Sequence, residues 1–158
     1  MFLIEPRAFD HPDVVRLIAE LQREYVTRYG GPDETPIETG EFDPPTGLFL
    51  VGTLDGDPVA AGGWRRVDAG VAEIKRMFVV DRARRRGLSR LMLAELESTA
   101  SLARYRRVVL MTGLAQPEAI ALYESNGYGV GEPYGIYARE PDARFYEKSL
   151  VDAAVSRG

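Results

Sequence analysis

Five arginines lie within residues 81–90, and four of them belong to the stretch Arg-Arg-Arg-Gly-Leu-Ser-Arg at 84–90. They give this segment a local charge of +4, although the net charge of the chain is −4. The segment follows an apolar stretch that predicts a buried strand, and it precedes a periodic stretch that predicts a helix. Backbone N–H groups at a helix start bind anions, and Gly87 lets a ligand approach without a Cβ in its way. The sequence therefore predicts an anion-binding turn.

The arginine segment lacks the sequence motifs of two common classes of anion-binding site. It has neither the Lys-Ser/Thr pair of a Walker loop nor the three glycines of a dinucleotide fingerprint, so nucleoside triphosphates and NAD are weak candidates. A duplex-binding protein is usually basic over a whole face, whereas this chain is acidic outside the arginine segment. We therefore expect a small polyanion as the ligand and no nucleic acid partner.

Composition excludes further classes of chemistry. The chain has no cysteine, which rules out disulfides, thiolate metal sites and a cysteine nucleophile, and no metal is expected. The one histidine, His11, falls in the first turn of a predicted helix and receives no catalytic role. No apolar run approaches the ~20 residues that span a bilayer, and the first residues do not read as a signal peptide. We expect a soluble cytoplasmic protein without a membrane partner.

The elements that must position the arginine segment alternate between strands and helices. With 158 residues, of which 45% are hydrophobic and 28% charged, the chain predicts one domain over 1–158. Residues 30–47 form a long loop, typical either of a ligand-binding segment or of a disordered connector. Asp10 is expected to cap the first helix. The predicted elements are strands over 1–6, 71–80, 106–112 and 143–150, a hairpin over 48–67 turning at 55–57, and helices over 10–30, 88–105 and 117–127.

Two motifs carry a resemblance to a known family. Residues 79–93 resemble motif A of the GNAT N-acetyltransferase superfamily, whose signature is Gln/Arg-x-x-Gly-x-Gly/Ala. Arg84 and Gly87 fill its first and fourth positions, and Ser89 stands where Gly or Ala is usual. Residues 112–128 resemble motif B, with Gln116 in place of the common Asn. The remaining motif B positions match: Ala119, Leu122, Tyr123, Gly127 and Tyr128. The resemblance covers 49–128 well and the flanks more loosely.

This resemblance implies an α/β fold of the α+β type. Its central sheet is mixed and mostly antiparallel, with about six or seven strands and about four flanking helices, and it splays at a parallel strand pair. Acetyl-CoA, the implied cosubstrate, lies in that opening. The implied acetyl-CoA contacts are backbone groups of Phe78, Val79 and Val80, the turn residues Arg84, Arg85, Arg86, Gly87, Leu88, Ser89 and Arg90, and the side chains of Gln116 and Tyr123.

The chemistry that the resemblance implies is acyl transfer to an amine in a ternary complex. An amine with a pKa near ~10.4 must lose a proton before it attacks. Glu73 is the candidate base, and an ion pair with Lys75 or an arginine is the alternative role for it. Tyr123 matches the family's usual proton donor to the departing thiolate, and plain packing under the sheet is its alternative. A backbone N–H, at Val79, would stabilise the oxyanion.

The acceptor is the least determined part of this interpretation. The acidic segment 33–43 would suit a cationic acceptor such as a polyamine, an aminoglycoside or a lysine side chain, although acidic loops are also simply soluble. A non-catalytic acyl-CoA-binding module is the alternative function, and the sequence leaves the acyl-chain preference and the oligomeric state, a homodimer included, open. The resemblance also implies the candidate acceptor contacts, because acceptor-binding loops of the family come from these regions: Tyr29, Asp33, Glu34, Trp64, Tyr134 and Tyr137.

Overall fold

A single sheet organises the computed structural model, which describes residues 1–151. Its seven strands run in the order β1-β2-β3-β4-β5-β7-β6. Every neighbouring pair is antiparallel except β4 and β5, which are parallel. The expected mixed, mostly antiparallel sheet is confirmed. The strands are β1 (Phe2–Pro6), β2 (Gly47–Leu54), β3 (Asp57–Asp68), β4 (Val71–Val79), β5 (Arg107–Gly113), β6 (Gly129–Val130) and β7 (Ala143–Ser149).

Three α-helices occur within residues 1–151, where about four were expected. They are α1 (Pro12–Tyr29), α2 (Leu88–Leu102) and α3 (Pro117–Ser125), and a single 3-10 turn, η1 (Asp81–Ala83), follows β4. These three correspond to the helices predicted over 10–30, 88–105 and 117–127, and residues 30–46 form no further helix, in line with the loop predicted there. Four prolines in this segment, at 32, 36, 44 and 45, remove backbone donors that a helix would need. None of the helices within the described residues is long and apolar enough to cross a membrane.

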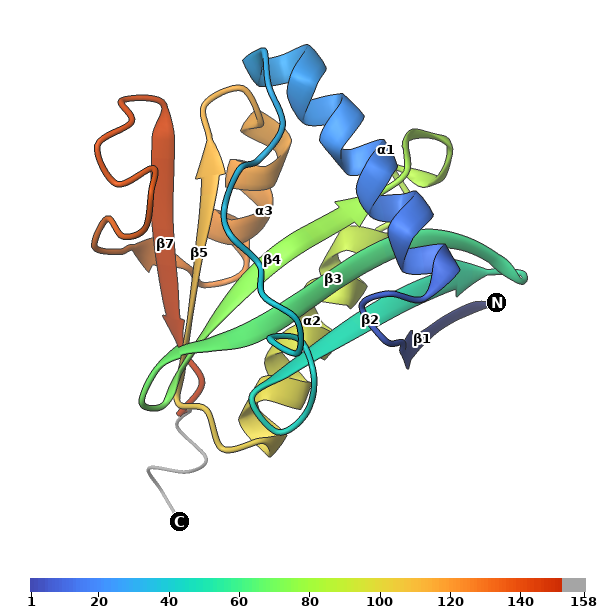
Figure 1. Cartoon of the computed structure of the whole chain (residues 1–158), viewed down its shortest axis with the longest axis horizontal. Coiled ribbons are helices and arrows are strands. Elements are labelled where there is room, and N and C mark those ends of the chain that lie inside the picture. The colour runs from blue at the N-terminus through green and yellow to red at the C-terminus, as the bar shows by residue number, and fades with distance from the viewer. Residues whose placement is uncertain (152–158) are drawn as a thin grey trace.

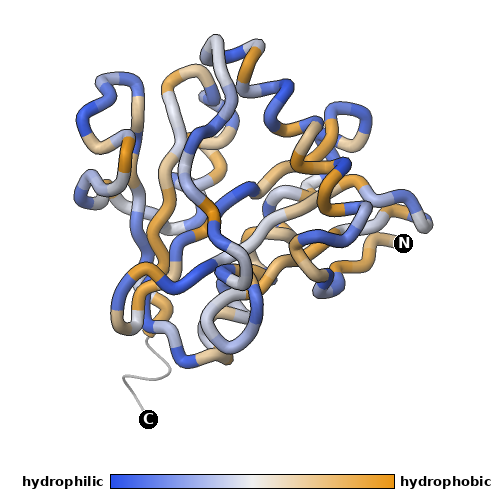
Figure 2. Tube along the Cα trace, in the orientation of Figure 1, coloured by the Kyte–Doolittle hydropathy of each residue, from blue (hydrophilic) through white to orange (hydrophobic). Residues whose placement is uncertain are grey.

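The helices cover both faces of the sheet. Figure 1 shows α1 crossing the front of the sheet and α2 lying behind it. Figure 2 shows orange, hydrophobic stretches along the central strands between these helices. Fully buried side chains from all three layers form one core, among them Val14 of α1, Phe49, Leu50 and Val51 of β2, and Met92, Leu93 and Leu96 of α2. Burial of this apolar surface fixes α1 and α2 against the strands between them.

The start of α1 corrects one prediction. His11, rather than Asp10, is the N-cap, and its Nδ1 atom accepts a hydrogen bond of 3.0 Å from the backbone N–H of Asp13. Such a bond satisfies one of the amides that a helix start leaves without a partner. The helix ends at Gly30, whose φ of 82° turns the chain away. His11 therefore has a structural role as the cap of α1.

The predicted hairpin between β2 and β3 is confirmed. Asp55 and Gly56 occupy the turn with φ values of 51° and 86°. Two positive φ values are the conformation that two-residue hairpins favour, and Asp-Gly is among the pairs that adopt it most readily.

The parallel pair β4 and β5 separates after three residue pairs. Val71, Ala72 and Glu73 pair with residues 107–109, and from Ile74 onward β4 has no partner in β5. All of β5 instead pairs with β7 on its other side. The expected splay at the parallel pair is confirmed, and it leaves the end of β4 with one free edge.

Candidate active site

A cavity of about 1350 Å³ opens where β4 and β5 diverge. Its wall comes from α1, the segment that follows α1, β4, the turn into α2, β5 and α3. Figure 1 shows these elements meeting around the upper ends of β4 and β5. Sites for one small molecule commonly measure ~300–1,000 Å³. The cavity therefore has room for two ligands, or for one extended ligand.

The arginine-rich turn forms one end of this cavity. Arg85 and Gly87 adopt left-handed backbone conformations, with φ values of 65° and 75°. Helix α2 then begins at Leu88, and the amides of its first turn have no partner inside the helix. A Cβ added at Gly87 would meet no atom within 4 Å, so the backbone there is open. The turn thus offers free N–H groups at a positive helix end, as an anion site requires.

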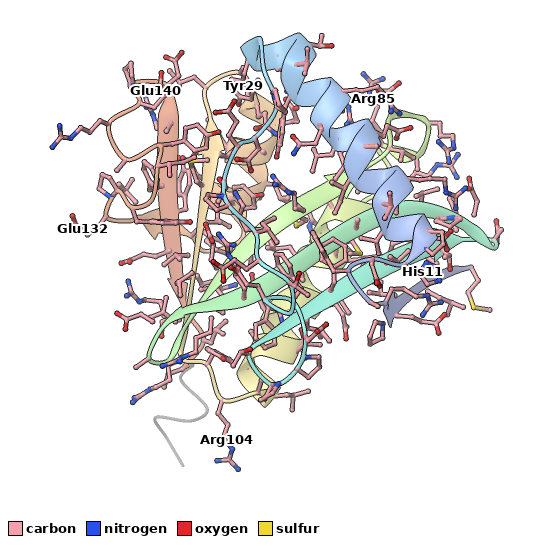
Figure 3. The ribbon with its side chains drawn as sticks, in the orientation of Figure 1. His11, Tyr29, Arg85, Arg104, Glu132 and Glu140 are labelled. Carbon is pink, nitrogen blue, oxygen red and sulfur yellow. The ribbon has the colours of Figure 1, made fainter. Side chains whose placement is uncertain are left out.

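The arginines of this turn differ in what they contact. Arg84 is held by the protein itself: its Nε donates to the Val79 carbonyl at 2.9 Å, its Nη2 donates to Glu24 at 2.6 Å, and it lies over the Phe78 ring. Arg85 and Arg90 are exposed and line the cavity, and Figure 3 shows Arg85 beyond α1. Arg86 is exposed but outside the cavity wall. Arg84 therefore shapes the turn, and Arg85 and Arg90 provide accessible charge.

The free edge of β4 forms the floor next to the turn. Phe78 and Val79 line the cavity and pair with β3 on their other side. Val80 is not part of the wall, and its N–H donates to the Val59 carbonyl at 2.9 Å. An extended ligand could therefore add to β4 as a further strand along Phe78 and Val79.

Tyr123 of α3 faces the same cavity. The residue is 7% exposed and packs against Tyr128 and Tyr146, with ring centroids 5.6 and 6.2 Å away. Burial raises the pKa of the Tyr123 hydroxyl well above its ordinary value, because desolvation disfavours the phenolate. At neutral pH this side chain is a protonated hydrogen-bond donor.

Gln116 and Tyr29 join α3 to the end of α1. The Tyr29 hydroxyl donates to Gln116 Oε1 at 2.9 Å, and both residues line the cavity. Gly113 makes this contact possible, since a Cβ there would lie 2.4 Å from the Tyr29 oxygen. Figure 3 shows Tyr29 at the end of α1 that is nearest to β5 and α3. The role of Gly113 was not foreseen, because nothing in the sequence indicates which side chain approaches it.

Glu73 is buried beside the cavity rather than in its wall. The residue is 3% exposed, and its two carboxylate oxygens accept hydrogen bonds from Arg65 Nε at 3.0 Å and from the Tyr134 hydroxyl at 2.9 Å. Burial and the neighbouring Glu73 charge raise the pKa of Tyr134, which keeps it protonated. The ion-pair alternative for Glu73 is therefore present, with Arg65 as partner. A role as base would require a relayed proton transfer.

The predicted acceptor contacts fall into two groups. Tyr29, Asp33, Glu34 and Tyr137 line the cavity, and the Glu34 N–H donates to the Tyr137 hydroxyl at 2.8 Å. Tyr134 is not part of the wall, and its hydroxyl donates to Glu73. Trp64 lies outside the cavity wall: its indole N–H donates to Thr99 of α2 at 3.0 Å, and its ring packs against Tyr105. Trp64 thus faces α2, on the side of the sheet opposite α1.

The family model for the acetyltransferase (GNAT) family matches residues 14–128. The chain belongs to this family. An IAA acetyltransferase from Azospirillum brasilense is 33% identical over 138 residues, which is 87% of this chain and 90% of that protein.

Solved GNAT structures have the same fold. A Klebsiella pneumoniae protein assigned as an acyl-CoA N-acyltransferase is 28% identical, with a TM-score of 0.82 over 95% of this chain and 98% of that chain. A GNAT acetyltransferase from Elizabethkingia anophelis was solved with acetyl-CoA bound. It is 15% identical, with a TM-score of 0.69 over 94% of this chain and 97% of that chain.

The two GNAT motifs therefore contribute to one cavity. The motif A residues Arg84, Gly87 and Ser89 lie in its wall, as do the motif B residues Gln116 and Tyr123. Within residues 1–151 no group of His, Asp and Glu side chains is arranged to hold a metal ion.

One charged cluster of this GNAT site was missed from the sequence. Lys75 and Arg76 of β4 line the cavity and are both buried, and both contact the carboxylate of Asp33. Burial would raise the pKa of Asp33, but Lys75 and Arg76 outweigh it, and the pKa lies well below its usual range. Two adjacent cations in a strand whose only other charged residue is Glu73 were the available signal.

Proposed function

We propose that this chain transfers an acetyl group from acetyl-CoA to an amine, in a ternary complex of protein, acetyl-CoA and acceptor. The observation that carries the proposal is the cavity between the diverging β4 and β5, with an anion-binding turn at one end and a buried tyrosine in its wall. The acetyl-CoA bound to the Elizabethkingia relative supports the choice of cosubstrate.

The turn before α2 would hold the pyrophosphate of acetyl-CoA. The free amides of residues 87–90 and the exposed side chains of Arg85 and Arg90 supply donors of matching charge. A hydrogen bond to a charged group contributes about 1.5–3 kcal/mol. The pantetheine arm would pair with the free edge of β4 at Phe78 and Val79, as an added strand does.

Acetyl-CoA supplies the activated acetyl group, and the residues around it would move protons and stabilise charge. Tyr123, kept protonated by burial, would donate a proton to the departing thiolate. A backbone N–H on the free part of β4, at Val79, would stabilise the oxyanion. General acid catalysis of this kind contributes about 10²–10⁴-fold to a rate.

The contacts of Glu73 support two roles. It holds Arg65 across the β3–β4 pair, and it accepts a hydrogen bond from Tyr134, through which a proton from the acceptor amine could be relayed. We retain the relayed base as a proposal, and the pH dependence of turnover separates it from the purely structural role.

The proposal is tested by release of free thiol from acetyl-CoA across a panel of amines, amino acids and short peptides. We expect turnover with at least one acceptor, and we expect Tyr123→Phe to lower kcat about 100-fold without changing the acetyl-CoA Kd. Tyr105→Phe is the matched control, because Tyr105 lies outside the cavity wall, and its kcat should stay near that of the unchanged chain. Tight acetyl-CoA binding without turnover on any acceptor would instead indicate the non-catalytic binding module.

A further inference from the structure

Strand β4 contains a bulge at the floor of the cavity. Lys75 pairs with Gly63 and Phe78 pairs with Ala61, so two β4 residues, Arg76 and Met77, lie opposite one residue of β3. Arg76 has a φ of 58° there, a left-handed conformation that is uncommon for a residue other than glycine.

The bulge places two consecutive cations on the same side of the strand. Neighbouring side chains of a regular strand point to opposite faces, yet Lys75 Nζ and Arg76 Nη1 both reach Asp33 Oδ2, the former at 2.8 Å. The side chains of Lys75, Arg76 and Asp33 are 7%, 5% and 9% exposed. One carboxylate thus faces two buried cations, and the cluster carries a net positive charge.

Asp33 is fixed in place by its own neighbours. Its carboxylate accepts hydrogen bonds from the Thr35 N–H and hydroxyl at 2.9 and 2.6 Å. Its backbone is held by Gln22, which accepts from the Asp33 N–H at 2.8 Å and donates to the Asp33 carbonyl at 3.2 Å. Asp33 therefore orients the two cations, and its strongly depressed pKa leaves it poorly suited to take up a proton.

The guanidinium of Arg76 has a hydrogen-bond donor without a partner in the described part of the chain. Asp33 contacts Nη1, whereas Nε is buried without any hydrogen-bond partner in the described part of the chain. A guanidinium has five N–H donors, and a buried donor without a partner costs about 1–3 kcal/mol. A second small anion beside Arg76 would compensate both the surplus charge and the missing acceptors.

The cluster and Tyr123, the proposed proton donor, line the same cavity. Desolvation raises the pKa of the buried Tyr25, and the charges of Asp33, Tyr123 and Arg76 also act on this hydroxyl. Tyr25 also lines this cavity, together with Asp33, Arg76 and Tyr123. The acidic residues Glu34, Glu140 and Asp142 also line the cavity, but they are exposed, so water and salt screen their charges. Figure 3 shows Glu140 beside the start of β7, at the outer rim.

We propose that the acceptor is an amine that also carries a carboxylate, as a free amino acid does, and that Arg76 and Lys75 bind this carboxylate. The inference rests on the proposed acetyl transfer and specifies its acceptor. This acceptor replaces the cationic acceptor that the acidic segment 33–43 suggested. Asp33 is the buried carboxylate of that segment in the cavity, and the two β4 cations already neutralise its charge.

The test compares free amino acids with their carboxamides, which keep the amine and lose the charge of the carboxylate. In the thiol-release assay we expect kcat/KM for the better amino acids to exceed that of their carboxamides by about 10–100-fold, the ratio that one charge-assisted hydrogen bond gives. Spermidine and cadaverine, which have amines but no carboxylate, should be poor acceptors. Preferred turnover of these polyamines or of the carboxamides would overturn the inference while leaving acetyl transfer intact.

A pair of variants locates the effect. Arg76→Gln should raise KM for the amino acid without changing the acetyl-CoA Kd. The ratio of kcat/KM for the amino acid to kcat/KM for its carboxamide should then approach one. Arg66→Gln, on the exposed part of β3 outside the cavity, should change neither value. An unchanged preference in a folded Arg76→Gln would overturn the assignment of Arg76.

A binding measurement covers the other outcomes. With CoA at saturation, thermal stabilisation of the unchanged chain by each amino acid is compared with stabilisation by its carboxamide. If no acceptor turns over, acetyl transfer fails as the function, and stronger stabilisation by the amino acids would still support the carboxylate site. Equal stabilisation by the amino acid and its carboxamide would overturn the carboxylate site. This measurement uses only the unchanged chain, so it decides the question even if Arg76→Gln does not fold.

Discussion

Replacing Gly87 by leucine separates the contribution of this residue to folding from its contribution to acetyl-CoA binding. Its backbone conformation favours glycine, and the space next to its Cα is open. Gly87 has a φ of 75°, and a Cβ there would meet no atom of the protein within 4 Å. The Cβ of the leucine would therefore clash with nothing in the described part of the chain. Holding a residue other than glycine in the left-handed conformation costs about 1–2 kcal/mol. For a domain of this size, that cost corresponds to a melting temperature about 2–8 °C lower.

The effect on acetyl-CoA binding should be much larger than the effect on stability. The leucine side chain would occupy the space in which we place the pyrophosphate, next to the free amides at the start of α2. Loss of two charge-assisted hydrogen bonds, at about 1.5–3 kcal/mol each, amounts to about 3–6 kcal/mol. Such a loss weakens binding on the order of 10²–10⁴-fold.

Gly56 provides a control with the same backbone cost. It has a φ of 86°, no atom lies within 4 Å of a Cβ built there, and it belongs to the β2–β3 turn outside the cavity wall. Gly56→Leu should lower the melting temperature to a similar extent and leave acetyl-CoA binding unchanged. Titration calorimetry with acetyl-CoA on both variants measures the difference. Unchanged binding in Gly87→Leu, or an equal loss in Gly56→Leu, would refute the pyrophosphate site.

Three further variants test single residues. A relayed base predicts that Glu73→Gln loses the acidic limb of the kcat pH profile; an intact limb with a lower free energy of unfolding would leave Glu73 as a structural partner of Arg65. Because the folded pKa of Asp33 is depressed, this residue adds stability above its unfolded value of 3.8 and loses it as the pH falls. The free energy of unfolding, measured with denaturant, should therefore fall more steeply below about pH 4 in the unchanged chain than in Asp33→Asn. Equal slopes in the two proteins would contradict the ion-pair cluster. Trp64→Phe should lower the melting temperature, since it loses the bond to Thr99, and should leave the acceptor KM unchanged; a large rise in KM would place Trp64 at the acceptor.

Features with a local cause could be predicted from the sequence. Asp55-Gly56 favours a two-residue hairpin wherever it stands between two strands, and the turn formed there. Gly87 between an apolar strand and a periodic helix predicts an open helix start, and α2 begins at the next residue. The parallel crossover from β4 through α2 to β5 follows from the order of the elements along the chain.

Features that depend on contacts between distant segments could not be predicted. The bulge at Arg76 arises from the register of β4 against β3, and no local pattern in β4 specifies it. The same register, together with the path of residues 30–46, selects Arg65 rather than Lys75 as the partner of Glu73 and brings Asp33 to Lys75. Trp64 was a candidate acceptor contact because acceptor-binding loops of the family come from this region, but strand alternation turns its side chain toward α2.

Hydrogen exchange of the protein with and without acetyl-CoA measures most directly whether the opening between β4 and β5 is the acetyl-CoA site. We expect slower exchange in the peptides that cover 74–79, the free edge of β4, and 87–91, the start of α2. Peptides from β1 and β2, which are already paired with each other and lie away from the opening, should exchange at unchanged rates. Protection elsewhere with unaltered exchange at 74–79 and 87–91 would contradict the proposed site.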